Sequence, residues 1–160
     1  MERGESRSHR CAILASGRGS NALNLLRFQR ERSDLFETAL LLSDRADAPV
    51  LQKAQEFNVK QTCVPRCEFR GRSEHERAVL NALQQEGVEW LLLAGYERLL
   101  SSSFLSSFWS EERGHNRVIN IHPSLLPDYP GLRAYEKAFQ DGVSFSGVTV
   151  HFVDAGMDTG

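Results

Sequence analysis

An amide and an imidazole two residues apart are the first sign of chemistry in this sequence. Asn120 and His122 end a β-branched stretch that begins at Val118, and Pro123 follows directly. β-Branched residues favour a buried strand, alternate side chains leave a strand on one face, and a proline tends to end it. We therefore predict that Asn120 and His122 project together from the carboxyl end of a strand, where open α/β sheets bind ligands.

This pair carries the groups that stabilise an oxyanion. A carbonyl attacked by a nucleophile becomes a tetrahedral oxyanion, to which an amide N–H and an imidazolium N–H can both donate. Because histidine titrates near neutral pH, His122 can also move a proton. The alternative is structural, with His122 bonded to the backbone at the end of a strand and Asn120 forming a turn.

A carboxylate that could orient the imidazole follows the last predicted strand, Val148–Val153. If this strand lies beside the strand of Asn120, the loop after it can fold back over His122. A carboxylate in that position favours the charged imidazole and fixes its orientation. Of the two in the loop, Asp154 and Asp158, the spacing favours Asp158 because it lies further past the strand end.

A glycine-rich turn, Ser16–Asn21, follows an apolar strand and precedes an amphipathic helix. Glycines let the backbone approach a ligand closely, and the N–H groups at a helix start attract phosphate. The run Gly17-x-Gly19-x-x-Ala22 also has dinucleotide-binding spacing, with Asp44 roughly where a ribose-binding acid would lie. The turn predicts a phosphate site without identifying the phosphate; a plain glycine turn with a serine cap is the alternative.

Three further candidates are weaker. His151 lies inside the last strand, where a direct role and a structural hydrogen bond both remain open. Arg72, in the basic stretch Phe69–Arg77, is a candidate phosphate ligand, with a solvated surface as the alternative. The stretch Gly95–Leu100 has backbone amides, an aromatic ring and leucines that could hold a flat heterocycle, or it is a surface loop.

Composition bounds the function. The chain has 160 residues, 41% of them hydrophobic and 25% charged, which suits one globular domain. A net charge of −2 gives no broad electrostatic case for nucleic acid or an anionic membrane. The cysteines at 11, 63 and 67 lack zinc-site spacing and further ligands, so we expect free thiols and no metal. Without a membrane-spanning run or a signal-peptide core, the chain is predicted to be cytoplasmic.

Strands alternate with helices along the chain. Strands are expected near 11–15, 38–42, 59–64, 88–94, 118–122 and 148–153, and helices from 21, from 49 to 57, over 78–83, over 99–109 and over 133–139. This order predicts a Rossmann-like three-layer α/β/α sandwich with a mostly parallel central sheet. The continuous hydrophobicity of the strands predicts that both faces of the sheet are covered.

Together these motifs resemble the phosphoribosylglycinamide (glycinamide ribonucleotide) formyltransferase family, within the folate-dependent formyltransferase superfamily. The resemblance runs from about Cys11 to Gly160 and is carried by four segments, Leu14–Asn21, Leu92–Leu100, Asn120–Gly131 and Val150–Gly160. The wider superfamily shares Asn-x-His with Ser-Leu-Leu-Pro, whereas the Gly-Ser-Asn turn and Tyr-Pro-Gly narrow the resemblance to this family.

The resemblance implies formyl transfer from 10-formyltetrahydrofolate to the primary amine of glycinamide ribonucleotide in purine biosynthesis, without a metal. It implies the catalytic residues Asn120, His122 and Asp158, the substrate phosphate-binding residues Gly19, Ser20 and Asn21, and the folate-binding residues Arg98, Leu99, Leu100, Asp154 and Asp158. We expect small-molecule partners only, a monomer or homodimer, a disordered tail over residues 1–9, and a catalytic domain over 10–160 that lacks a final strand and helix.

Other functions compete with this one. A formyltetrahydrofolate hydrolase would use the same three side chains with water as the acceptor. A methionyl-tRNA formyltransferase would need an RNA-binding domain and a more basic surface. A non-catalytic nucleotide-binding module would use only the glycine turn. A dinucleotide oxidoreductase would leave Asn120, His122 and Asp158 without a purpose.

Overall fold

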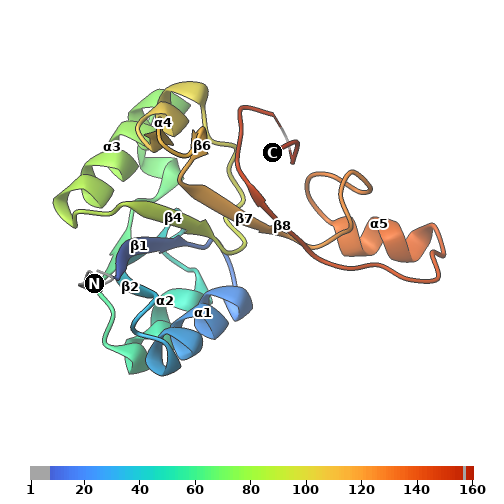
Figure 1. The fold of residues 1–160 in the computed structure, drawn as a ribbon, viewed down its shortest axis with the longest axis horizontal. Coiled ribbons are helices and arrows are strands. Elements are labelled where there is room, and N and C mark those ends of the chain that lie inside the picture. The colour runs from blue at the N-terminus through green and yellow to red at the C-terminus, as the bar shows by residue number, and fades with distance from the viewer. Residues whose placement is uncertain (1–7, 157) are drawn as a thin grey trace, which may run out of the picture. The chain divides into compact units, whose positions relative to one another are not determined.

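The computed structural model describes residues 8–156 and 158–160, which fall into two compact units, Met1–Tyr96 and Glu97–Gly160 (Figure 1). The first unit contains β1 (His9–Leu14), α1 (Ser20–Glu31), β2 (Phe36–Ser43), α2 (Pro49–Lys53), a 3₁₀ turn (Ala54–Phe57), β3 (Gln61–Cys63), a second 3₁₀ turn (Arg66–Glu68), α3 (Arg72–Gln85) and β4 (Trp90–Leu93). The second contains α4 (Ser102–Ser106), β5 (Trp109–Ser110), β6 (His115–Asn116), β7 (Val118–His122), α5 (Ala134–Gln140) and β8 (Thr149–Phe152).

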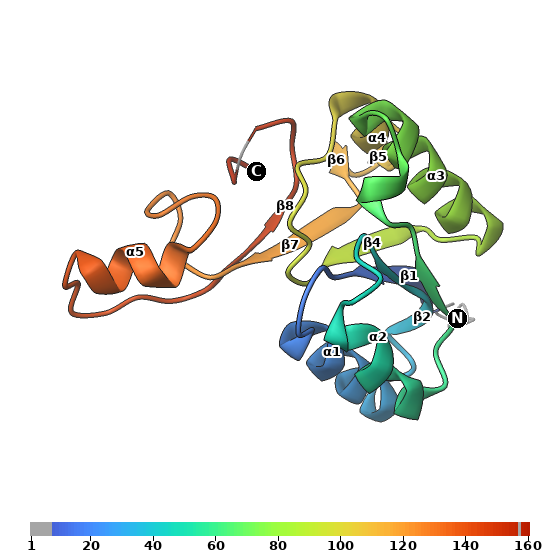
Figure 2. The same ribbon diagram turned by 180° about the vertical axis from the view of Figure 1, so that it is seen from behind.

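The first unit is built on four parallel strands in the order β3-β2-β1-β4. In the centre, Ala12 of β1 lies opposite Leu40 of β2 and Leu91 of β4. Figures 1 and 2 show α1 and α2 on one side of these strands and α3 on the other. A sheet covered on both faces explains the continuous apolar runs Cys11–Leu14 of β1 and Ala39–Leu42 of β2, which are buried at every position.

Two cores lie under these helices. Beneath α1 and α2, the buried residues are Ile13, Ala15, Ala22, Leu23, Leu26, Leu41, Ala48, Val50, Ala54 and Ala94. Val79 and Leu83 are the buried aliphatic residues of α3. Each fully buried leucine stabilises the fold by roughly 1.5–3 kcal/mol, so the helix-period leucines hold the first unit around β1.

The second unit is built on β7 and β8, which pair antiparallel. Asn120 lies directly opposite His151 in this pairing, and His122 lies opposite Thr149. The connection between the two strands carries α5, and β5 and β6 form a separate short antiparallel pair (Figure 1). The antiparallel pairing therefore brings His151, 31 positions further along the chain, beside the Asn120 that the sequence analysis selected.

Several predicted elements are shorter or differently placed. The helix predicted over 99–109 is limited to α4, and the strand predicted over 59–64 is limited to β3. β8 is not covered on both faces, since Val150 is 66% and Phe152 41% exposed. His9, assigned to the tail, is the first residue of β1, and residues 1–7 lie outside the described residues. No helix within the described ranges combines the length and apolar character needed to cross a bilayer.

Candidate active site

The carboxylate of Asp158 is the centre of a polar cluster in the second unit. Its Oδ2 accepts a hydrogen bond from the backbone N–H of Gly131 at 2.7 Å and lies 3.3 Å from Nδ1 of His122. Its Oδ1 lies 3.5 Å from Nδ2 of Asn120 and 3.6 Å from Nε2 of His151. Residues of β7, of the loop after it and of β8 thus meet at one carboxylate.

The turn after β8 returns Asp158 to the strands. The N–H of Val153 donates to the carbonyl of Val118 at 2.9 Å, which continues the pairing one residue past β8. Asp154 then accepts from the N–H of Gly156 and the hydroxyl of Thr159, and these bonds close the turn. Asp158 itself has a left-handed backbone (φ 56°), which a non-glycine residue adopts at a cost and which is concentrated at functional sites.

His122 uses both ring nitrogens. Nδ1 faces the Asp158 carboxylate, and Nε2 lies 2.9 Å from the carbonyl oxygen of Tyr129. A carbonyl and an ionised carboxylate only accept hydrogen bonds, so this arrangement satisfies both N–H groups of an imidazolium. The side chain is only 5% exposed, where a charge needs such partners. His122 therefore has the backbone bond of the structural alternative and also the carboxylate contact.

The loop between His122 and Gly131 is held in place by its own polar groups. The hydroxyl of Ser124 donates to the carbonyl of Asp128 at 2.6 Å. Tyr129 has φ 55°, a left-handed conformation, in the turn whose carbonyl faces His122. The contributions of Tyr129 and Gly131 come from backbone atoms, which side-chain identity does not reveal, so the sequence analysis missed both.

The chemistry available here is oxyanion stabilisation with proton transfer. An imidazole and an amide nitrogen both lie against one carboxylate, and an N–H of each can donate to a negatively charged oxygen. The imidazole can also exchange a proton with a substrate or a water. Among the described residues, no group of three His, Cys, Asp or Glu side chains is arranged to hold a metal ion.

The glycine turn of the first unit presents backbone N–H groups. Gly19 caps α1 with φ 72°, and a Cβ at this position would lie 2.1 Å from Cγ2 of Val50. Ser20 and Asn21 follow as the first two residues of the helix, and both are exposed. The first turn of this 12-residue helix has no acidic side chain, so its N–H groups and the helix dipole favour an anion.

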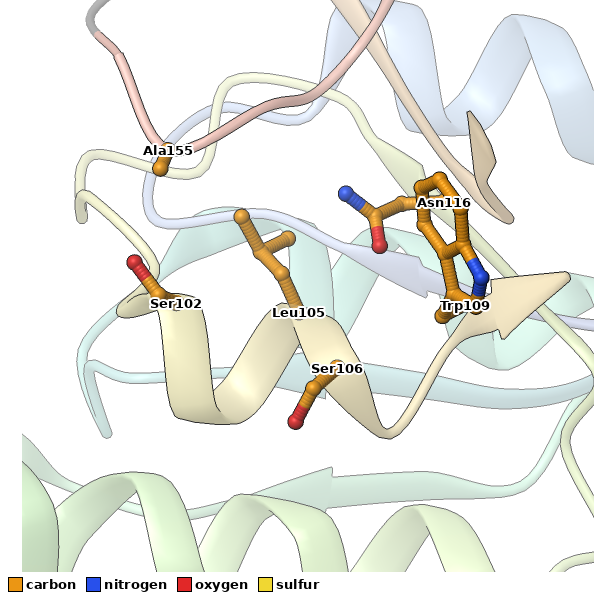
Figure 3. Close-up of a pocket in the computed structure, with 6 residues that line it drawn as sticks. All are labelled: Ser102, Leu105, Ser106, Trp109, Asn116 and Ala155. Carbon is orange, nitrogen blue, oxygen red and sulfur yellow. The ribbon is translucent and has the colours of Figure 1, made fainter. Parts of the chain in front are cut away.

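A pocket of about 210 Å³ lies on α4 in the second unit (Figure 3). It is lined by Ser102, Leu105, Ser106, Trp109, Asn116 and Ala155. Ala155 belongs to the loop 154–158 that the resemblance assigns to folate. Among the described residues, Arg98, Leu99 and Leu100 are not in this lining; Leu100 is buried and Leu99 is 56% exposed.

The sequence analysis missed the α4 residues of this pocket. Positions 102, 105 and 106 follow the i, i+3, i+4 spacing of one helix face, and Trp109 lies beyond the end of α4, in β5. That spacing was the available signal, although the serines made the helix itself uncertain.

Arg72, the other candidate phosphate ligand, is engaged within its own helix. Its Nε donates to Oε1 of Glu76 at 3.0 Å, in the first turn of α3. The Arg72 side chain is half-exposed, whereas Glu76 is largely buried. Because the Glu76 carboxylate is largely buried, moving Arg72 to an anion would take this hydrogen bond from it, which costs more than breaking a fully exposed pair.

Comparison with known proteins identifies the family of the chain. The formyl transferase family model matches residues 9–160. The chain is 37% identical over 149 residues to phosphoribosylglycinamide formyltransferase of Bacillus subtilis, covering 93% of this chain and 73% of that one. It is 32% identical over 156 residues to the human trifunctional purine biosynthetic protein adenosine-3, covering 98% of this chain and 15% of that protein.

A solved structure gives the same result for the fold. Glycinamide ribonucleotide transformylase 1 from Symbiobacterium toebii superposes with a TM-score of 0.89 at 39% identity, covering 99% of this chain and 71% of that one. The predicted α/β fold with a mostly parallel sheet flanked by helices is therefore confirmed, as is the resemblance on which the predicted family rests. The chain belongs to the formyl transferase family.

Proposed function

We propose that this protein transfers a formyl group from 10-formyltetrahydrofolate to the primary amine of glycinamide ribonucleotide, as a phosphoribosylglycinamide formyltransferase of purine biosynthesis. The observation that carries the proposal is the meeting of Asn120 and His122 at the Asp158 carboxylate. The identity with the B. subtilis enzyme supports the choice of substrates. These substrates are small molecules, and the protein acts as a monomer or homodimer.

The amine nitrogen attacks the formyl carbon and forms a C–N bond, while the carbonyl oxygen takes the negative charge. The Nδ1–H of His122 keeps its contact with Asp158. The Nε2–H leaves the carbonyl oxygen of Tyr129 and donates to the oxyanion instead. The N–H of Asn120 donates to the same oxygen. When the intermediate collapses, the bond to the folate nitrogen breaks, and a proton passes from the amine to that nitrogen through water.

The glycine turn binds the phosphate of the ribonucleotide through Gly19, Ser20 and Asn21. Two N–H groups at the helix start and two polar side chains are available for the anion. Arg72 adds a positive charge to this site, at the cost of its hydrogen bond to Glu76. Anchoring the anionic end lets the amine react in an effectively unimolecular step.

The folate binds in the second unit. Leu105 and Trp109 offer apolar surface to a flat ring in the pocket on α4 (Figure 3), and Ala155 connects it to the loop of Asp154 and Asp158. The resemblance also assigns Arg98, Leu99 and Leu100 to the folate-binding residues.

The first experiment separates transfer from hydrolysis. We expect the protein to consume 10-formyltetrahydrofolate and form formylated glycinamide ribonucleotide only when the ribonucleotide is present. Release of formate at the same rate without the ribonucleotide would instead identify a hydrolase. Tight ribonucleotide binding with no formylfolate binding would identify a non-catalytic module.

A second experiment tests the phosphate role. The double substitution Ser20→Ala with Asn21→Ala removes side-chain donors at an exposed helix start and should weaken ribonucleotide binding by about tenfold or more. Formylfolate binding should change little. Calorimetry with each ligand measures both, and parallel loss of the two affinities would remove the phosphate role from this turn.

A further inference from the structure

His151 is hydrogen-bonded in a way that defines where its proton lies. Nδ1 lies 3.1 Å from the carbonyl oxygen of Phe152, which only accepts, so Nδ1 carries the hydrogen. Nε2 lies 3.2 Å from Nδ2 of Asn120, which only donates, so Nε2 carries none. These two contacts fit the neutral imidazole with its hydrogen on Nδ1.

The Asp158 carboxylate, which only accepts, selects one orientation of the Asn120 carboxamide. Nδ2 has an acceptor on each side, Nε2 of His151 and Oδ1 of Asp158, so rotating the amide by 180° would place its oxygen against two acceptors. The contact with His151 is the shorter one, at 3.2 Å against 3.5 Å. The second N–H of Asn120 faces Asp158 at the longer distance. This N–H is the one that can donate to a substrate oxygen instead.

We propose that His151 is a positioning residue for formyl transfer: its neutral imidazole holds the Asn120 amide with one N–H directed at the reacting carbonyl, and protonation of His151 releases that amide. This inference rests on the proposed function, because it takes the oxyanion of formyl transfer as the acceptor of the second N–H of Asn120. The side chain of His151 is 7% exposed, so its bond to Asn120 is shielded from competing water.

Protonation has a defined structural consequence. A hydrogen on Nε2 would face the N–H groups of Asn120 at 3.2 Å, donor against donor, and the nearby acceptor is Oδ1 of Asp158 at 3.6 Å. The titratable groups facing His151 are Asp158 and, across that carboxylate, His122. A protonated His151 would therefore release Asn120 and compete with His122 for Asp158, and kcat should fall as the pH is lowered.

The test compares two substitutions at this position. His151→Gln can place a non-titrating amide oxygen near Nε2, whereas His151→Leu removes the acceptor. We expect His151→Leu to lower kcat by about tenfold or more with KM for both substrates within about threefold. His151→Gln should keep most of kcat. Its kcat should also fall less than that of the wild type as the pH is lowered, because the part of that decrease due to His151 is removed. His115→Gln is the matched control, since His115 also bonds a neighbouring carbonyl through Nδ1 and should leave the pH profile unchanged.

Other outcomes overturn the proposal. Wild-type kcat in His151→Leu, equal losses in both variants, or an unchanged acid limb in His151→Gln would each do so. Thermal unfolding of each variant separates these results from a failure to fold. If the wild-type chain forms no formylated ribonucleotide, the proposed function fails. Nitrogen-15 NMR of the His151 ring still tests the tautomer, and a hydrogen on Nε2 at neutral pH contradicts the proposal.

Discussion

The glycine turn and the Asp158 cluster prepare for ligands by different means. The turn uses consecutive residues and backbone N–H groups, positioned by the start of α1. The cluster uses side chains as far apart as Asn120 and Asp158, 38 positions along the chain, positioned by antiparallel pairing and a closed turn. The turn should therefore be sensitive to backbone shape and the cluster to the charge and hydrogen-bonding groups of its side chains.

The largest effect is expected from Asp158→Asn. The substitution keeps the side-chain size but removes the charge that orients His122 and faces Asn120, so two oxyanion donors are disturbed together. We expect kcat to fall by about 10³-fold or more, with a smaller change in KM. Steady-state kinetics at saturating folate measure this.

Asp154→Asn is the matched comparison, because that carboxylate accepts from Gly156 and Thr159 within its own turn. Its effect should be mainly on KM for the folate. If Asp154→Asn lowered kcat as much as Asp158→Asn, the cluster would not depend on one carboxylate, and the contrast with the glycine turn would disappear.

A smaller effect on a different quantity is expected from Gly19→Ala. The added Cβ would meet Val50 and would also require a left-handed φ, so the free energy of unfolding should fall by about 2–4 kcal/mol. Ribonucleotide affinity should fall with it, because the helix start must shift. Urea unfolding and calorimetry measure the two changes.

Gly17→Ala is the control within the same turn, since a Cβ at Gly17 meets nothing within 4 Å. Its unfolding free energy should stay within about 1 kcal/mol of the wild type. Equal destabilisation by the two substitutions would show that the turn does not depend on the shape at Gly19.

The smallest expected effect is a difference in thiol reactivity that tests the buried strand leading to the glycine turn. Burial, with a contribution from the Glu89 carboxylate, raises the pKa of Cys11 from 9.0 to about 12. At pH 8 its thiolate fraction is therefore about 10⁻⁴, and iodoacetamide should label exposed Cys67 but not Cys11 until the chain unfolds. Rapid labelling of Cys11 in the folded protein would contradict this burial.

The same shift gives a sign for stability. The folded chain holds the Cys11 proton up to a pH of about 12, whereas the unfolded chain loses it near 9.0. The contribution of Cys11 to the free energy of unfolding should therefore decrease as the pH rises through this window. Comparing wild type with Cys11→Ala by urea unfolding at pH 8 and pH 10 isolates that contribution.

The sequence could predict what depends on local order. Neighbouring residue types predict the apolar strands, the glycine turn and the helix after it. They also predict that Asn120 and His122 lie on one face of a strand. The direction of β8 could not be predicted in this way, because an apolar run does not encode whether its neighbour is parallel or antiparallel.

The missing part of the site depends on nonlocal geometry. The carbonyl of Tyr129 and the N–H of Gly131 exist at nearly every position of any chain, so no residue type marks them as partners of His122 and Asp158. Two roles were open for His151, and only its register opposite Asn120 shows what it contacts. Spacing favoured Asp158 over Asp154, but the closed turn that brings its carboxylate to His122 could not be predicted from spacing.

The central claim, that His122 stabilises charge on the reacting carbonyl, is tested most directly by the single-turnover rate of formyl transfer in His122→Ala. The account predicts a rate about 10²–10³-fold below that of the wild type, while the dissociation constants for ribonucleotide and formylfolate stay within about threefold. A wild-type rate, or a loss of rate matched by an equal loss of substrate binding, would contradict it.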